Sequence, residues 1–221
     1  MRTTSGARAR RGPARDSGVS LVELLVAMSI FVVVIGVFMS GVVSMTRVTA
    51  RAQGVSDSET AARRVMDRFD KQVRYSTAVN SAGFGAAGTT GPLYVEYLVP
   101  AQASDGSPYC AQWRYDPTAR TVALRTWTDS VTPSPSAWSI LATNVRNIAT
   151  NPPFVLTFAS LSLVSQELTV TLDIGPAARA GVLVSTTYVA RNTSVNTTSN
   201  TDANGDLASD SPVCRTGVGR P

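Results

Sequence analysis

One segment near the N-terminus constrains the fold of this chain more than any other. From Leu24 to Val43, 20 residues, the only polar side chains are those of Ser29 and Ser40. A helix of about 20 apolar residues spans the hydrocarbon core of a bilayer. Serine hydroxyls are tolerated in such a helix because they hydrogen-bond to carbonyls of their own turn. The sequence therefore predicts one transmembrane helix.

The basic character of the chain comes from the residues that precede this helix. The 221 residues carry a net charge of +5, and residues 1–18 contain five arginines and one aspartate. Residues 19–221 are left with 15 basic and 14 acidic groups. Basic residues before an apolar span are typical of a cytoplasmic flank. The balanced remainder gives no basic surface for nucleic-acid phosphates, so no nucleic-acid partner is predicted for the bulk domain.

Two simpler interpretations of the apolar segment are a secretory signal peptide and a plain signal-anchor. A signal peptide has an apolar core of about 7–15 residues and then a small-residue cleavage site. Here the core is longer, and Ser44–Arg47 make a poor site. A plain anchor does not explain Glu23, because a charge at a bilayer centre costs about 2.5–3.5 kcal/mol or more. Taken alone, Glu23 has the alternative interpretation of a harmless interfacial flank.

Residues 18–26 read Gly-Val-Ser-Leu-Val-Glu-Leu-Leu-Val. With the basic leader and the apolar span, they resemble the prepilin-type cleavage and methylation segment of the type IV pilin superfamily, although Val19 stands where Phe is usual. The resemblance implies that a prepilin peptidase cuts between Gly18 and Val19 and methylates the new amine. It also implies that Glu23 pairs with the Val19 amine of a neighbouring subunit, since a charge in low dielectric is tolerated when paired. Residues 65–74 and 188–192 resemble minor pilins and pseudopilins more weakly.

Beyond the membrane segment, the same helix is expected to continue. No proline occurs between Pro13 and Pro92, which permits one helix from about Val19 to about Tyr75. Its second half carries a stripe with alternating spacings of four and three, apolar at every position except Glu59. This stripe predicts packing on a sheet of the same chain, with a two-helix coiled coil as the alternative. The stripe consists of Val48, Ala52, Val55, Glu59, Ala62, Met66, Phe69 and Val73.

After a glycine-rich connection, β-branched and aromatic runs separated by turn residues predict seven strands. We therefore expect an α+β fold, in which a long N-terminal transmembrane and spine helix packs on an antiparallel β-sheet domain. Trp113 and Trp127, on a predicted hairpin turning at 115–120, are interpreted as core residues rather than as a binding platform. The predicted strands are Tyr94–Val99, Cys110–Tyr115, Thr121–Trp127, Ile140–Ile148, Val155–Ala159, Leu168–Ile174 and Val182–Ala190. The predicted organisation is a leader 1–18, removed on processing, a membrane and filament-core helix 19–45, its amphipathic continuation 46–80, the sheet domain 81–191 and a polar tail 192–221.

The chain has two cysteines and a polar C-terminal segment. Cys110 and Cys214 are either a disulfide of an extracytoplasmic domain or two unrelated thiols, because the sequence does not show that they meet. Residues 192–221 lack apolar periodicity and are predicted to be a mobile tail or a loosely packed loop. Within them, Asp202, Asn204 and Asp206 alternate as in calcium loops, but no glutamate closes a twelve-residue loop. An Asx-rich turn is therefore preferred to a calcium site.

These features favour a structural subunit over an enzyme. The chain has no histidine, the usual general base, and no glycine-rich phosphate loop, so neither catalysis nor a cofactor is predicted. The resemblance implies a minor pilin or pseudopilin, with a slight preference for a type IV pilus over a type II secretion pseudopilus. The implied partners are the prepilin peptidase, other pilin subunits and the membrane. The implied location is a single-pass cell membrane protein with a cytoplasmic N-terminus and an extracytoplasmic C-terminal domain, which then joins a cell-surface filament. Alternatives are a tip adhesin and a membrane-anchored protein that never assembles.

Overall fold

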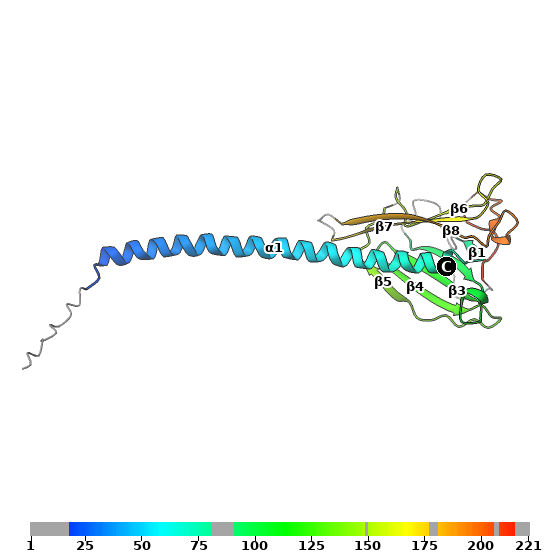
Figure 1. The fold of residues 1–221 in the computed structure, drawn as a ribbon, viewed down its shortest axis with the longest axis horizontal. Coiled ribbons are helices and arrows are strands. Elements are labelled where there is room, and N and C mark those ends of the chain that lie inside the picture. The colour runs from blue at the N-terminus through cyan, green and yellow to red at the C-terminus, as the bar shows by residue number, and fades with distance from the viewer. Residues whose placement is uncertain (1–17, 81–90, 149, 177–180, 206–207, 215–221) are drawn as a thin grey trace, which may run out of the picture. The chain divides into compact units, whose positions relative to one another are not determined.

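The computed structural model describes residues 18–80, 91–148, 150–176, 181–205 and 208–214. The chain divides into two compact units, Met1–Ala50 and Arg51–Pro221. Its helix and strands together make the α+β layout that the sequence predicts (Figure 1). The elements are α1 (Leu21–Val73), β1 (Ala78–Asn80), β2 (Leu93–Val99), β3 (Tyr109–Asp116), β4 (Thr121–Thr128), β5 (Ser139–Thr143), β6 (Phe154–Thr157), β7 (Glu167–Ile174) and β8 (Val182–Val189), with short 3-10 turns at Ala101–Ala103 and Thr198–Asn200.

The strands form two antiparallel sheets in the unit Arg51–Pro221. One sheet has the order β1-β2-β3-β4-β5, and the other has the order β6-β7-β8. All seven predicted strands are present, but β5 ends at Thr143 and not at Ile148. The strand stops there because Asn144 adopts a left-handed conformation with a φ of 58°. Val145 then forms an isolated antiparallel bridge with Ile174 of β7.

The C-terminal part of α1 packs between the two sheets (Figure 1). Phe69 is fully buried, and its ring stacks on Trp113 of β3 with 4.2 Å between centroids. On the other side it contacts Phe154 of β6 and Tyr188 of β8, at 5.9 and 6.0 Å. The Tyr188 hydroxyl also donates to the helix carbonyl of Met66, over 3.0 Å. One side chain of the helix therefore contacts both sheets.

The predicted apolar stripe is buried only in its second half. Its last four members pack in the core, as expected, whereas the first four are exposed. The buried residues of α1 begin only at Ser58, so the sheets cover the helix from that point onward. Exposure of Glu59 explains how a charged residue is accommodated at a stripe position. Val65 and Gln72 are also buried and widen the contact beyond the predicted stripe.

The hairpin between β3 and β4 forms as the sequence predicts. Asp116 accepts hydrogen bonds from the backbone amides of Thr118 and Ala119, each over 2.9 Å, which is the Asx arrangement that starts such turns. Both tryptophans of the hairpin are buried core residues, but they do not meet. Trp113 lies in the main core with α1, whereas Trp127 belongs to a second cluster around the cysteines.

The segment Asn192–Cys214 is not the mobile tail or loosely packed loop that its composition predicts, over the residues that the structure describes. Fully buried Gln166 donates to the carbonyl of Ser199 over 3.0 Å and to that of Val79 over 3.3 Å. Asn80 and Ser209 exchange two further hydrogen bonds. The polar groups of this segment are thus satisfied by β1 and by the loop before β7. Composition misses this packing because the partners are distant in the sequence.

Candidate processing and assembly site

The bond between Gly18 and Val19 lies immediately before the helix. Gly18, Val19 and Ser20 are exposed and outside α1, and the amide of Leu24 donates to the carbonyl of Ser20 over 3.1 Å. Helical hydrogen bonding therefore begins just after the Gly18–Val19 bond. A Cβ atom on Gly18 would meet nothing within 4 Å, so packing against the described residues does not explain the glycine. The residues on both sides of the bond are therefore exposed and lie outside the helix.

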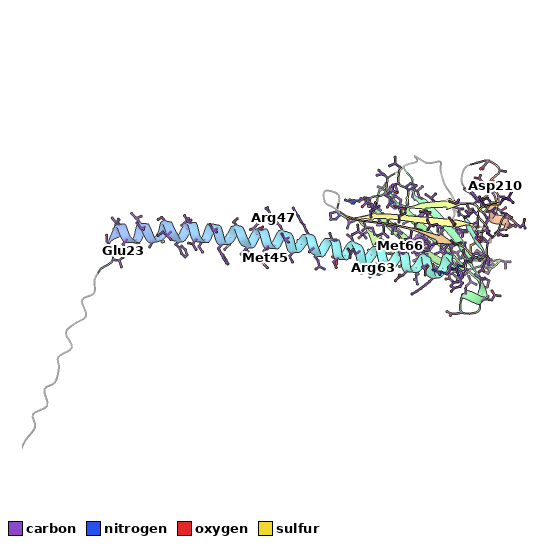
Figure 2. The ribbon with its side chains drawn as sticks, turned by 45° about the horizontal axis from the view of Figure 1, so that its top comes forward. Glu23, Met45, Arg47, Arg63, Met66 and Asp210 are labelled. Carbon is purple, nitrogen blue, oxygen red and sulfur yellow. A yellow bond between two sulfur atoms is a disulfide. The ribbon has the colours of Figure 1, made fainter. Side chains whose placement is uncertain are left out.

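Glu23 lies in the first turn of α1 (Figure 2). The first turn carries the positive end of the helix dipole, which stabilises a carboxylate there. The side chain is exposed, and it has no hydrogen-bond or ion-pair partner among the residues that the structure describes.

The apolar part of α1 is exposed on every side. From Leu21 to Met45, the large apolar side chains expose between 40% of their surface at Ile35 and 75% at Leu21. By its length and composition, the helix can cross a membrane. Burying a Val, Leu, Ile, Phe or Met side chain contributes about 1.5–3 kcal/mol. Such an exposed apolar surface is consistent with a membrane anchor.

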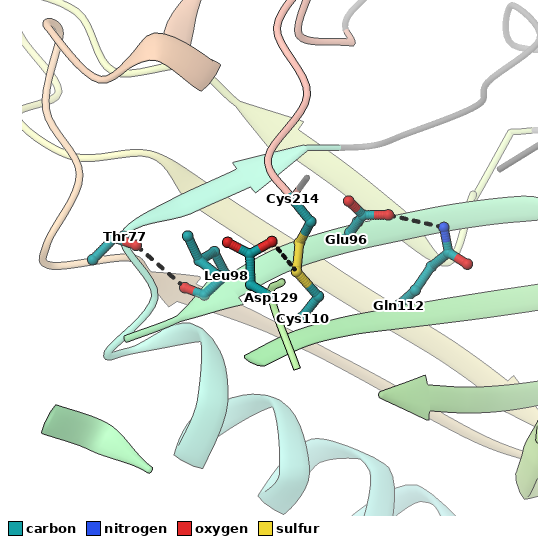
Figure 3. Close-up of a disulfide and its surroundings, with 7 residues drawn as sticks. All are labelled: Thr77, Glu96, Leu98, Cys110, Gln112, Asp129 and Cys214. Atoms are coloured by element: carbon teal, nitrogen blue, oxygen red, sulfur yellow. Dashed lines mark hydrogen bonds between the residues drawn. A yellow bond between two sulfur atoms is a disulfide. The ribbon is translucent and has the colours of Figure 1, made fainter. Parts of the chain in front are cut away.

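Cys110 and Cys214 form a disulfide with 6.2 Å between their Cα atoms (Figure 3). The sequence allows either a disulfide or two unrelated thiols, and the structure contains the disulfide. Both cysteines are buried, and the cluster around them includes Trp127 and Val213. The bond links the C-terminal segment to β3 across 104 residues. Disulfides persist mainly in oxidising compartments.

The weak calcium candidate is found in a turn. The carboxylate of Asp202 accepts a hydrogen bond from the backbone amide of Gly205 over 2.8 Å, which is an Asx-type contact. Asn204 is exposed in the same turn, and Asp206 lies outside the described residues. No group of three or more carboxylate, cysteine or histidine side chains suited to a metal is found among the residues that were described. The carboxylate of Asp202 stabilises the turn itself.

The sequence analysis missed a polar row on the five-stranded sheet. Glu96, Gln112 and Arg125 are direct neighbours on β2, β3 and β4. Gln112 donates to Glu96 over 2.9 Å and accepts from Arg125 over 2.8 Å, with Glu96 and Gln112 fully buried. The available signal was their strict alternation with the core residues Val95, Trp113 and Leu124. Polar residues at such positions are ordinarily solvent-facing, which is why the pattern alone did not single them out.

Residues 13–39 match the family model of the prokaryotic N-terminal methylation motif. The match includes Gly18, Val19 and Glu23 and most of the apolar span. No curated protein and no solved structure matches the chain. The motif is the signature of type IV pilins, a family whose members are structural rather than enzymatic. An α+β layout with one long apolar N-terminal helix agrees with a pilin-like fold. The chain therefore carries, at residues 13–39, the prokaryotic N-terminal methylation motif that is the signature of type IV pilins.

Proposed function

We propose that this protein is a processed subunit of a type IV pilus or a related membrane-rooted filament. The observation that carries the proposal is the coincidence of three features in one helix: the methylation motif, an exposed Gly18–Val19 bond and an apolar surface exposed on every side. Prepilin peptidase cleaves this bond at the cytoplasmic face and methylates the new amine of Val19. The helix then anchors the chain in the membrane, with the unit Arg51–Pro221 outside the cytoplasm.

Assembly moves the helix from lipid into a bundle of similar helices. In that bundle, van der Waals packing replaces contact with lipid. The carboxylate of Glu23, which has no partner within the described chain, pairs with the Val19 amine of a neighbouring subunit. Pairing matters because an isolated charge in low dielectric is costly. A subunit out of register leaves both charges unpaired, so Glu23 selects the correct axial position.

Within this class we propose a low-copy minor pilin. Residues 19–221 are large for a major subunit, and the unit Arg51–Pro221 has two sheets and a disulfide. A pseudopilin of a type II secretion system uses the same segment in the same way and is the nearest alternative. Genes adjacent to this one distinguish the two, because pili and secretion systems have different accessory components.

Replacement of Glu23 by Ala tests the assembly role. In cells with an active prepilin peptidase, the variant is expected to be processed and retained in the membrane but absent from sheared filaments. The matched control is Glu59→Ala, which removes an exposed carboxylate from the same helix. Filament incorporation is measured by immunoblotting of sheared and membrane fractions. Normal incorporation of the Glu23 variant would contradict the pairing mechanism, and incorporation of neither the wild type nor the control would indicate an anchor that does not assemble.

A further inference from the structure

A cluster of arginine and aromatic side chains lies on the face of the five-stranded sheet that points away from α1. Alternate residues of a strand point to opposite faces. Trp113 of β3 contacts α1, so its neighbour Arg114 lies on the outer face. The register places Tyr94 of β2 directly opposite Arg114. Arg125 of β4 lies on this face as well, since it bonds to outward-facing Gln112.

Trp138, just before β5, is the centre of this cluster. The guanidinium carbon of Arg114 lies 4.6 Å from the centroid of the Trp138 ring, and that of Arg125 lies 4.5 Å from it. Tyr94 approaches the same ring with 6.3 Å between centroids. All four side chains are half-buried. We call these residues, Tyr94, Arg114, Arg125 and Trp138, the arginine–tryptophan cluster.

The two arginines of the cluster differ in their polar contacts. Arg125 donates to Gln112, which donates in turn to the buried carboxylate of Glu96. Burial lowers the pKa of Arg125, although the nearby carboxylate of Glu96 opposes this shift. Arg114 itself has no hydrogen bond or ion pair within the described chain, and its buried Nε atom has no acceptor. A guanidinium group has five donors in a fixed planar fork that matches a carboxylate. Because the Nε atom of Arg114 is buried, its terminal Nη groups are the donors that remain for an anion from solvent, beside the rings of Trp138 and Tyr94.

We propose that the arginine–tryptophan cluster binds a carboxylate-bearing polysaccharide, such as a polyuronate, with one uronate carboxylate on the guanidinium of Arg114. A charged hydrogen bond of this kind is roughly twice as strong as a neutral one. The half-exposed ring of Tyr94 offers an apolar face against which the C–H groups of a pyranose ring can pack.

Two observations favour an acidic sugar over other polyanions. β2, β3 and β4 are internal strands paired on both sides, so their backbone groups are engaged in the ladder. A peptide that adds to a sheet needs main-chain hydrogen bonds to a free strand edge. These three strands offer no free edge to such a peptide. Nucleic acid requires several basic contacts to neutralise phosphates, whereas residues 19–221 hold 15 basic against 14 acidic groups. The ligand is therefore one that side chains alone recognise.

The inference does not depend on filament assembly, so it is tested on the full chain in neutral detergent micelles. Trp113 and Trp127 are buried and Trp138 is half-exposed, so ligand-induced changes in tryptophan fluorescence report on Trp138. Tetragalacturonate is expected to give a saturable change, which Trp138→Phe abolishes. Arg114→Gln is expected to weaken binding about tenfold, the effect of one charged hydrogen bond. Arg63→Gln is the matched control, because it removes one exposed positive charge from α1 and should leave the affinity unchanged.

Several results would overturn the proposal. Equal weakening by Arg63→Gln would indicate nonspecific charge attraction. The same response from maltotetraose, tetraglutamate, an oligonucleotide or sodium sulfate at matched ionic strength would remove the assignment to an acidic sugar. No saturable change with tetragalacturonate would remove the site altogether. Near-UV circular dichroism of Arg114→Gln, which is expected to equal that of the wild type, shows that the variant is folded.

Discussion

Replacement of Phe69 by Ala tests the central packing of the unit Arg51–Pro221. The ring is fully buried and touches Tyr97 and Trp113 of one sheet and Phe154 and Tyr188 of the other. Large-to-small replacement of a buried phenylalanine costs about 3–5 kcal/mol of unfolding free energy. For a unit of this size, each kcal/mol lowers the melting temperature by about 2–4 °C. We therefore expect a decrease of about 6–20 °C.

The assay is thermal unfolding of the detergent-solubilised chain. It is monitored by near-UV circular dichroism, because the buried ring of Trp113 loses its ordered environment when the unit unfolds. Phe69→Leu keeps part of the apolar volume, so it should lower the free energy of unfolding less than Phe69→Ala does. Arg68→Ala, at the exposed neighbouring position, is the control and should change the unfolding free energy by less than about 0.5 kcal/mol. A loss below about 1 kcal/mol for Phe69→Ala, or an equal loss for Arg68→Ala, would refute the packing of α1 between the sheets.

Three further predictions concern the C-terminal segment and the pH dependence of stability. Replacing both Cys110 and Cys214 by Ser should lower the free energy of unfolding by about 2–5 kcal/mol. It should also make the C-terminal segment sensitive to limited proteolysis. Unchanged proteolysis would contradict the disulfide as the main attachment of this segment. Gln166→Leu should lower the free energy of unfolding by about 2–4 kcal/mol, because it leaves buried backbone groups without partners. Chemical denaturation measures this loss, and Gln53→Leu, on the exposed part of α1, is the control. Burial raises the pKa of Tyr188 to about 12, so the native state retains a proton that the unfolded chain loses near pH 10. Its contribution to stability should be complete below pH 10 and lost between pH 10 and about 12. Unfolding titrations of Tyr188→Phe should then show a weaker alkaline loss, and a loss as steep as in the wild type would contradict this assignment.

The sequence predicted the helix and the strands well because each has a strong local signal. Apolar residues without proline specify α1, and it begins and ends two residues inside the predicted bounds. Asp116 and Pro117 specify the hairpin turn through local chemistry. β1 was missed because three residues, Ala78–Asn80, are too few for a pattern. It exists through pairing with β2, a contact between segments distant in the sequence.

The candidate sites also differ in whether their residues are contiguous in the sequence or are brought together by the fold. The motif around Gly18, Val19 and Glu23 is contiguous, so the sequence alone locates it. The disulfide depends on where the fold brings Cys110 and Cys214, and the sequence left it open. The arginine–tryptophan cluster was invisible for a related reason. Its members come from three strands and a loop, and only the register of β2, β3 and β4 brings them together.

The most direct test of the central claim is the intact mass and the N-terminal residue of the protein from native membranes. Processing between Gly18 and Val19 removes the leader, and methylation adds one methyl group to the new amine. The proposed function predicts a chain that begins at methylated Val19 in cells with an active prepilin peptidase. A chain that still begins at or near Met1 in those cells would contradict pilin-type processing and leave a simple membrane anchor.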